Sequence, residues 1–223
     1  MPEEQNRIVA DHLSDLLFCP TDASVSNLTA EGLDSKAVVV GDVMYDASLY
    51  YREQTSDSSL PDLPAEFFLV TLHRAENTDD PSRLRAIVEA LNAYRDLPAV
   101  LPLHPRTRGA LSRNHLSFES HVRVLPPVGF QEMIQLESKC KWILADSGGV
   151  QKEAYFFHKP CGTLRDETEW VETVHAGANT LLGADRDRIL HFLREDKPQP
   201  EWPPLYGEGD AGEKIVKTLL ERF

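Results

Sequence analysis

A short turn with two glycines carries the residues whose types and spacing best suit the binding of an anion. An apolar stretch, 142–145, runs into Asp146-Ser147-Gly148-Gly149, and a helical pattern containing Glu153 follows. Glycine lets the backbone approach a ligand, Ser147 can cap the helix and donate to an oxygen, and the free amides of a first helical turn attract phosphate. Glu153 can accept hydrogen bonds from hydroxyl groups attached to that phosphate, such as those of a ribose. A tight connection between a strand and a helix would use the same residue types, so the motif alone leaves both interpretations open.

Three further polar clusters follow other strand-like segments. They are His73-Arg74, His104-Pro105-Arg106 and the run 165–169. Because ligands of open parallel sheets sit outside the carboxyl ends of the strands, we expect all four clusters to lie along one rim. A histidine at the end of a strand could equally cap a neighbouring backbone group, and Arg106 could simply be exposed to solvent.

The elements that must position these clusters alternate between strand and helix, which is typical of a parallel sheet with helices on both faces. The predicted strands of the larger part are 67–72, 99–103, 122–125, 142–145, 161–164 and 180–182, and its predicted helices are 81–95, 131–138, 150–157 and 187–194. The pattern predicts a Rossmann-like α/β domain.

The two ends of the chain show smaller patterns. Residues 1–45 alternate in the same way, with predicted helices at 8–13 and 23–33 and strands at 16–19 and 37–40, but they are too few to form a domain. A stretch rich in Ser, Asp and Pro, 52–64, is typical of a connecting loop. The last helix, 211–222, has an apolar stripe and is predicted to pack across a domain junction.

Composition narrows the classes of partner. The chain has 223 residues and a formal net charge of −13, which argues against sequence-independent nucleic-acid binding, so recognition of phosphate must be local. Cys19, Cys140 and Cys161 are far apart in apolar runs, which predicts buried thiols in a reducing compartment and no metal site. Since no run approaches the roughly 20 apolar residues of a membrane span, and the first residues are unlike a signal peptide, we expect a cytoplasmic protein without a membrane partner.

Several segments together resemble the non-hydrolysing UDP-N-acetylglucosamine 2-epimerases, in the family's order and over nearly the whole chain. The segments are residues 2–7 (PEEQNR), 40–47 (VGDVMYDA), 70–77 (VTLHRAEN), 102–106 (PLHPR), 146–154 (DSGGVQKEA) and 164–173 (LRDETEWVET). The resemblance implies two Rossmann-like domains in a glycosyltransferase-B-like architecture, of which this chain is the carboxyl-terminal half. It also implies interconversion of UDP-N-acetylglucosamine, or a 2,3-diacetamido analogue, and its manno epimer by elimination and re-addition of UDP, with no cofactor.

The chain departs from the family pattern at its start, because the family's Gly-Thr-Arg-Pro-Glu, His-Gly-Asp and Glu-Ala-Gly-Leu-Arg segments are absent. We therefore expect residues 1–50 to be a remnant of the sugar-facing domain, 51–65 to connect, and 66–223 to form the UDP-binding domain. Such a chain should keep UDP binding but catalyse little epimerisation alone. The alternatives are a non-catalytic UDP-sugar-binding module, half of a split enzyme with a separately encoded amino-terminal domain, and, with less support, a glycosyltransferase. Uncovered apolar surface on the first forty residues and the last helix would favour self-association, for example as a homodimer.

The resemblance also implies residue roles. Glu3 would be a catalytic acid or base, although an acid in a first helical turn also suits the helix dipole. Arg7 would reach the diphosphate, or else pair with Glu3 within the helix. His73 would contact the UDP phosphates and assist departure of the leaving group, and His104 would line the nucleotide side.

The remaining implied roles concern the ligand's other parts. Ser147, Gly148 and Gly149 would bind the diphosphate, and Glu153 the ribose hydroxyls. Phe130 and Met133 would surround the uracil, although apolar residues at this spacing are more often plain core. The sugar would face Arg165, Thr168 and Glu169, whereas Trp170 is expected to pack that loop down.

Overall fold

The computed structural model describes residues 2–54, 63–197 and 200–222. Their contacts divide the chain into two units, one made of Met1–Tyr50 with Pro203–Phe223 and a larger one made of Tyr51–Trp202. Each unit is described by itself below.

The larger unit contains one parallel sheet of six strands in the order β5-β4-β3-β6-β7-β8. The strands are β3 (Phe68–Thr71), β4 (Ala99–Pro102), β5 (Val122–Leu125), β6 (Ile143–Ala145), β7 (Cys161–Thr163) and β8 (Asn179–Leu181). All six were predicted, and their ends differ from the prediction by at most one residue. In chain order, β3, β4 and β5 run from the centre of the sheet to one edge, and β6, β7 and β8 run from the centre to the other edge. The strand order therefore reverses between β3 and β6. In sheets of this kind the reversal leaves a crevice at the carboxyl ends of the two central strands.

Helices surround this sheet. They are α4 (Ala75–Thr78), α5 (Pro81–Ala93), α6 (Pro105–Arg113), α7 (Phe130–Lys139), α8 (Gly148–Phe156), α9 (Val171–His175) and α10 (Arg186–Arg194). The four helices predicted for this unit are confirmed as α5, α7, α8 and α10, but α4, α6 and α9 were not predicted. Two of these are single turns, and α6 buries only Thr107, Ala110 and Leu111, which is too weak an apolar pattern to recognise in the sequence.

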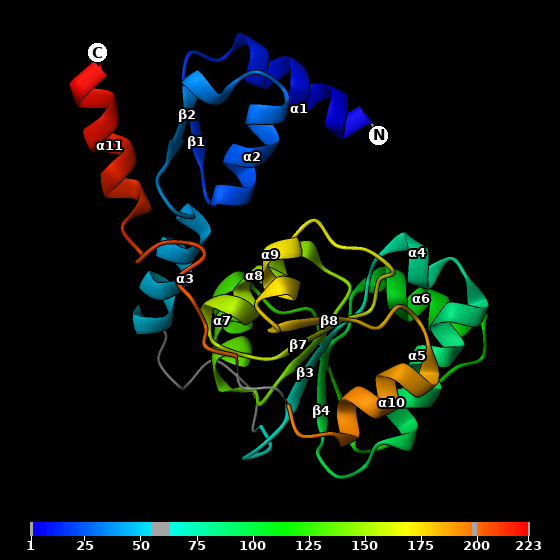
Figure 1. Ribbon diagram of the computed structural model, residues 1–223. Helices are drawn as coiled ribbons and strands as arrows, with labels where there is room; N and C mark the ends of the chain where they lie inside the picture. The colour runs from blue at the N-terminus through cyan, green and yellow to red at the C-terminus, as the bar shows by residue number, and fades with distance from the viewer. Residues whose placement is uncertain (1, 55–62, 198–199, 223) are drawn as a thin grey trace. The chain divides into compact units, whose positions relative to one another are not determined.

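The core lies on both faces of the sheet because β3 is buried on each. Phe68 and Val70 join a cluster formed with α5, α6 and α10, whereas Phe67 and Leu69 join a second cluster formed with α7 and α8. Figure 1 shows α5 and α10 side by side, and the two helices are in contact. A strand buried on both faces has a continuous apolar sequence, as this one does. The predicted class, a Rossmann-like α/β sheet with helices on both faces, is confirmed.

The smaller unit contains a two-stranded parallel sheet, β1 (Leu17–Cys19) and β2 (Ala37–Val39). Its helices are α1 (Pro2–Leu13), α2 (Asp22–Ala30), a 3₁₀ turn (Asp34–Lys36), the first part of α3 (Val43–Gln54) and α11 (Ala211–Arg222). Helix α3 was not predicted. The Asp46 carboxylate accepts hydrogen bonds from the amides of Ala211 (3.1 Å) and Gly212 (2.7 Å), and so caps α11. This contact groups the last segment of the chain with the first fifty residues.

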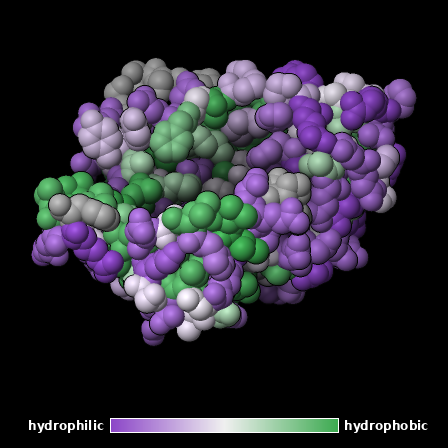
Figure 2. Space-filling view, turned by 90° about the horizontal axis from the view of Figure 1, so that it is seen from above, coloured by the Kyte–Doolittle hydropathy of each residue, from purple (hydrophilic) through white to green (hydrophobic). Residues whose placement is uncertain are grey.

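Several large apolar side chains on the smaller unit are exposed. They include Val9 and Leu13 of α1, Val39 of β2, and Val216 and Leu220 of α11. Figure 2 shows hydrophobic patches among a largely hydrophilic surface. The expected uncovered apolar surface is therefore present. In the described part of the chain, no helix is long and apolar enough to cross a membrane, and all three cysteines are buried free thiols, as predicted.

Candidate functional site

Asp146, directly after β6, joins the two central strands where the strand order reverses. Its side chain is fully buried and accepts hydrogen bonds from the backbone amides of His73 (2.9 and 3.0 Å) and Arg74 (2.8 Å). It also accepts from Asn77 Nδ2 at 3.2 Å, and that amide group donates to the Leu164 carbonyl at 2.9 Å. The turns after β3, β6 and β7 are thus fixed to one another. No role was predicted for Asp146 and Asn77 from the sequence, although an acid directly after a buried parallel strand was an available signal.

His73 lies beside this carboxylate. Its Nδ1 is 3.5 Å from Asp146 Oδ1, and its ring centroid is 5.6 Å from that of His104. Burial lowers the pKa of His73, the charge of Asp146 opposes that change, and His104 and Arg74 lower the pKa further. The imidazole is therefore neutral at pH 7, and an Nδ1–H directed at the carboxylate leaves Nε2 free to accept a proton.

Of the two histidines, His104 is the one that caps a helix. Its Nδ1 accepts from the amide of Arg106 at 3.1 Å, at the start of α6. Arg106 is not simply exposed to solvent, because its Nε donates to Thr78 Oγ1 (2.9 Å) and its Nη2 pairs with Asp79 (2.6 Å). Arg106 thus ties α6 to the end of α4, whereas the contact of His104 lies within the first turn of α6.

The glycine turn differs in detail from the prediction. Helix α8 begins at Gly148, but the Ser147 side chain makes no capping hydrogen bond, so the predicted cap is wrong. Gly148 and Gly149 do not have a positive φ, so the backbone conformation does not require glycine here. A methyl group built on Gly148 would lie 3.5 Å from Trp170 Nε1 and 3.8 Å from Arg74 Nη2. The guanidinium of Arg74 and the carboxylate of Glu169, which is also 3.8 Å from this point, therefore both lie beside the amino end of α8. Of these groups, the guanidinium and the helix end favour an anion. Arg74 was absent from the predicted site residues.

The loop after β7 is fastened to α8. Trp170 Nε1 donates to the Gly148 carbonyl at 2.8 Å, and the ammonium of Lys152 lies 4.5 Å from the ring centroid. The predicted role of Trp170 in packing this loop down is confirmed. Thr168 Oγ1 donates to Gln151 Oε1 at 2.6 Å, which adds a second attachment that the sequence analysis missed.

Arg165 and Glu169, in the same loop, form a two-pronged ion pair at 2.9 and 3.0 Å. The guanidinium is largely buried, whereas Glu169 is exposed. The structure thus brings three predicted sugar-facing residues, these two and Thr168, into one rigid loop near the start of α8. Their contact with a sugar stays a prediction.

Glu153 of α8 interacts with Glu137 of α7, a residue that the sequence analysis did not single out. Glu137 is fully buried and Glu153 is 7% exposed. Burial, the charge of Glu153 and a hydrogen bond with Glu153 raise the pKa of Glu137 far above its usual value. Burial also raises the pKa of Glu153, but the hydrogen bond from Glu137 and the charge of Lys152 oppose that change. These opposing effects place the larger rise in pKa on Glu137 and favour the negative charge on Glu153.

Phe130 and Met133 occupy different surroundings at the start of α7. Met133 packs against the core, as the alternative interpretation expected. Phe130 is 47% exposed and meets the ring of Tyr51 edge-to-face, with centroids 5.4 Å apart. A hollow of about 400 Å³ is lined by these two rings with Gly129, Gln131 and Glu132. An open aromatic hollow can accept a flat ring.

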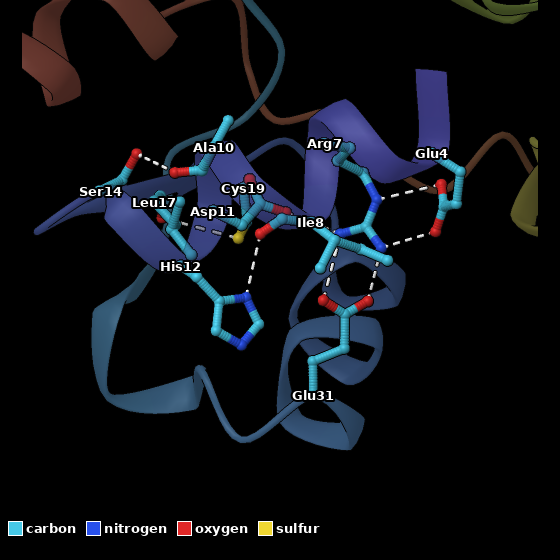
Figure 3. Close-up of polar contacts among 10 residues, drawn as sticks. All are labelled: Glu4, Arg7, Ile8, Ala10, Asp11, His12, Ser14, Leu17, Cys19 and Glu31. Carbon is cyan, nitrogen blue, oxygen red and sulfur yellow. Dashed lines mark hydrogen bonds and ion pairs between the residues drawn. The ribbon is translucent and has the colours of Figure 1, made fainter. Parts of the chain in front are cut away.

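The predicted site residues of the smaller unit are Glu3 and Arg7. The Glu3 side chain lies outside the described part of the structure. Arg7 forms ion pairs with Glu4 (2.7 Å), Asp11 (2.7 Å) and Glu31 (2.5 Å), as Figure 3 shows. Its contact with a diphosphate stays a prediction.

A doubly wound parallel sheet with a helix amino terminus and polar side chains at the strand-order reversal is typical of nucleotide-binding α/β proteins. Residues 1–220 match the family model described as UDP-N-acetylglucosamine 2-epimerase. The chain belongs to this family.

Individual relatives agree with this assignment. The chain is 52% identical to UDP-2,3-diacetamido-2,3-dideoxy-D-glucuronate 2-epimerase of Pseudomonas aeruginosa, over 99% of this chain and 64% of that protein. It is 37% identical to the Methanocaldococcus jannaschii UDP-GlcNAc 2-epimerase solved with UDP-GlcNAc and UDP, with a TM-score of 0.84 over 99% of this chain and 65% of that one. The Neisseria meningitidis enzyme bound to UDP-GlcNAc gives 31% identity and a TM-score of 0.85, again over 99% and 65%. The chain thus spans slightly less than two thirds of its relatives, and the matches confirm the predicted glycosyltransferase-B-like fold.

Proposed function

We propose that the larger unit binds the UDP part of a UDP-N-acetylhexosamine at the carboxyl ends of β3 and β6. The observation that carries this proposal is the junction at Asp146, which holds the turn bearing His73 and Arg74 against the amino end of α8. The diphosphate would accept hydrogen bonds from the first amides of α8 and from the guanidinium of Arg74, with Ser147 as a further donor.

The rest of the nucleotide would follow α8 and α7. Glu153, five residues after Gly148 in α8, would accept hydrogen bonds from the ribose hydroxyls. The hollow beside Phe130 would take the uracil ring, since its aromatic wall is exposed and its volume of about 400 Å³ suits a small ring.

We infer from family membership that the reaction is interconversion of a UDP-N-acetylhexosamine and its 2-epimer by elimination and re-addition of UDP. His73 suits departure of UDP, because a bound diphosphate beside its ring would raise its pKa and allow the imidazolium to donate to the leaving oxygen. Glu3 is proposed as an acid or base at the sugar. His104 would line the nucleotide side, Arg7 would reach the diphosphate, and Arg165, Thr168 and Glu169 would face the sugar.

The sugar is proposed to be a 2,3-diacetamido sugar, with UDP-N-acetylglucosamine as the alternative. The 52% identical relative named for the diacetamido glucuronate favours the first, whereas the 37% identical structure contains UDP-GlcNAc. The proposed protein partner is a second copy of the chain, with a separately encoded amino-terminal domain as the alternative.

Calorimetric titration tests the binding proposal. We expect UDP to bind to the chain, and Arg74→Gln to weaken binding by about 10- to 100-fold, because a charge-assisted hydrogen bond to phosphate is worth about 1.5–3 kcal/mol. Arg85→Gln, which removes an exposed arginine of α5, is the matched control and should bind UDP like the wild type. Absence of UDP binding, or equal loss in both variants, would contradict the proposed site.

A further inference from the structure

The buried carboxyl pair formed by Glu137 and Glu153 joins the two helices on one face of the sheet. Glu137 is fully buried and lies near the thiols of Cys140 and Cys161, whereas Glu153 keeps a small exposed area. In the described part of the structure, no amide, hydroxyl or cationic group donates to either carboxyl oxygen of Glu137. Glu153 is the polar group that it faces.

Such an arrangement requires a proton. An ionised carboxylate without a donor is very costly inside a protein, and two adjacent carboxylates cannot both be charged there. A protonated Glu137 instead donates one hydrogen bond to Glu153, which satisfies both groups. The pair therefore consists of an inner neutral acid and an outer carboxylate.

Neighbouring titratable groups favour this distribution of charge. The cation of Lys152 stabilises the negative charge on Glu153. The thiols of Cys140 and Cys161, which also lie near Glu137, have pKa values raised by burial, to about 12 for Cys161, and so remain neutral. Lys159 is near Cys140 and acts on that thiol.

A purely structural pair would be an unusual choice here, because apolar side chains of similar size could fill this interior at lower cost. The outer carboxylate, however, is on α8, the helix whose first turn is proposed to hold the diphosphate. An anchored carboxylate can present its second oxygen in one fixed direction, which lowers the entropic cost of binding a pair of hydroxyl groups.

We propose that Glu137 is a positioning residue for ribose recognition, which donates its proton to Glu153 and thereby fixes that carboxylate as the acceptor for the ribose hydroxyls. This inference rests on the proposed UDP binding. It adds a residue that does not itself touch the ligand, and it makes ribose recognition depend on a proton held inside the protein.

Two substitutions of Glu137 distinguish the effect of its hydrogen-bond donor from the effect of its size. Glu137→Gln keeps a donor to Glu153, whereas Glu137→Leu removes it. Each variant is titrated with UDP and with 2′,3′-dideoxy-UDP, which lacks the ribose hydroxyls. We expect Glu137→Gln to bind UDP within about threefold of the wild type, and Glu137→Leu to lose about tenfold for UDP but little for the dideoxy compound.

The outcomes distinguish this inference from the function on which it rests. If the wild type binds neither compound, the proposed UDP site is wrong. If the wild type binds UDP but a folded Glu137→Leu protein retains the same preference for UDP over dideoxy-UDP, the positioning role is wrong. Infrared spectroscopy adds a test that needs no ligand and no stable leucine variant: the wild type at neutral pH should show the carbonyl band of a buried protonated carboxyl, and Glu137→Gln should lack it. Absence of that band from the wild type would contradict the claim that Glu137 is protonated and donates to Glu153.

Discussion

The Asp146 carboxylate joins the turns that follow β3 and β6. It accepts from two consecutive backbone amides and one side-chain amide while fully buried. Groups like these are costly when they lose their partner, because water cannot replace it. The residue therefore sets the positions of His73 and Arg74 without touching the proposed ligand itself.

Replacement of Asp146 by alanine should lower the free energy of unfolding by about 3 kcal/mol, because it leaves buried donors without an acceptor. Asp166→Ala is the control, since that side chain is 65% exposed and pairs with Arg83 at the surface. It should cost about 1 kcal/mol or less. Denaturant unfolding measures both, and equal effects would contradict the assigned role of Asp146.

The pKa of His73 should be below 6.5 in the free protein, because burial disfavours the charged ring. A lowered folded pKa means that this histidine contributes stability above pH 6.5 and loses that contribution as pH falls through the folded pKa. Binding of UDP should raise the pKa, since a diphosphate favours the imidazolium. Titration of the ring signals by NMR, with and without UDP, provides the values. If UDP leaves the pKa of His73 unchanged, His73 does not lie beside the bound diphosphate.

At the scale of elements, Gly162 in β7 leaves no room for a side chain. A methyl group on Gly162 would lie 2.6 Å from Cδ2 of Leu144, in the neighbouring strand β6, and 2.6 Å from Cδ1 of Leu182, directly after the other neighbour, β8. The absence of a side chain at this position allows α10 to pack closely, as Phe192 of that helix is 3.1 Å from the same point.

Gly162→Ala should therefore lower the free energy of unfolding by about 1–3 kcal/mol through overpacking. Gly109→Ala is a matched control in α6, where the added methyl group would meet only the end of the Arg113 side chain at 3.3 Å. Alanine is the better helix former, so this variant should be unchanged or more stable by up to about 1 kcal/mol. Thermal unfolding of the two variants checks the difference, and a Gly162→Ala protein as stable as Gly109→Ala would contradict it.

Elements with a strong apolar pattern were predictable from the sequence, and those held by polar contacts were not. The strands β3, β4 and β6 are rich in apolar residues, and α5 and α10 bury an apolar stripe, so these elements were readily recognised. The strand β8 (Asn179–Leu181) and the helix α8, which is buried nearly all round, have weaker patterns. Helix α6 has a local cap, in which His104 accepts from the amide of Arg106, but the ion pair of Arg106 with Asp79 joins residues distant in sequence. The glycine turn was recognisable as a candidate anion site, and His73-Arg74 as a polar cluster at the rim, but Glu137 was not, because its proposed role depends on neighbours brought together by folding.

At the scale of the whole molecule, apolar side chains on α1 and α11 are exposed, among them Leu13 (81%), Val216 (57%) and Leu220 (79%). Gly212, Glu213, Val216, Lys217, Leu220 and Glu221 line a shallow apolar groove along α11. Apolar area of this kind tends to be covered by a partner.

The purified chain should therefore self-associate, and Val216→Glu combined with Leu220→Lys should reduce association. Val171→Lys is the control, because Val171 is an exposed valine of the larger unit (48%) and its replacement should change association little. Light scattering over a range of protein concentrations measures the mass. A wild-type monomer at all concentrations would show that these side chains do not drive association.

The measurement that tests the central claim most directly is an amide NMR titration of the chain with UDP. We predict that the largest shifts fall on His73, Arg74, Ser147, Gly148 and Gly149, because these residues surround the amino end of α8. Shifts confined to other parts of the protein, or no shifts at millimolar UDP, would contradict a nucleotide site at the reversal of the strand order.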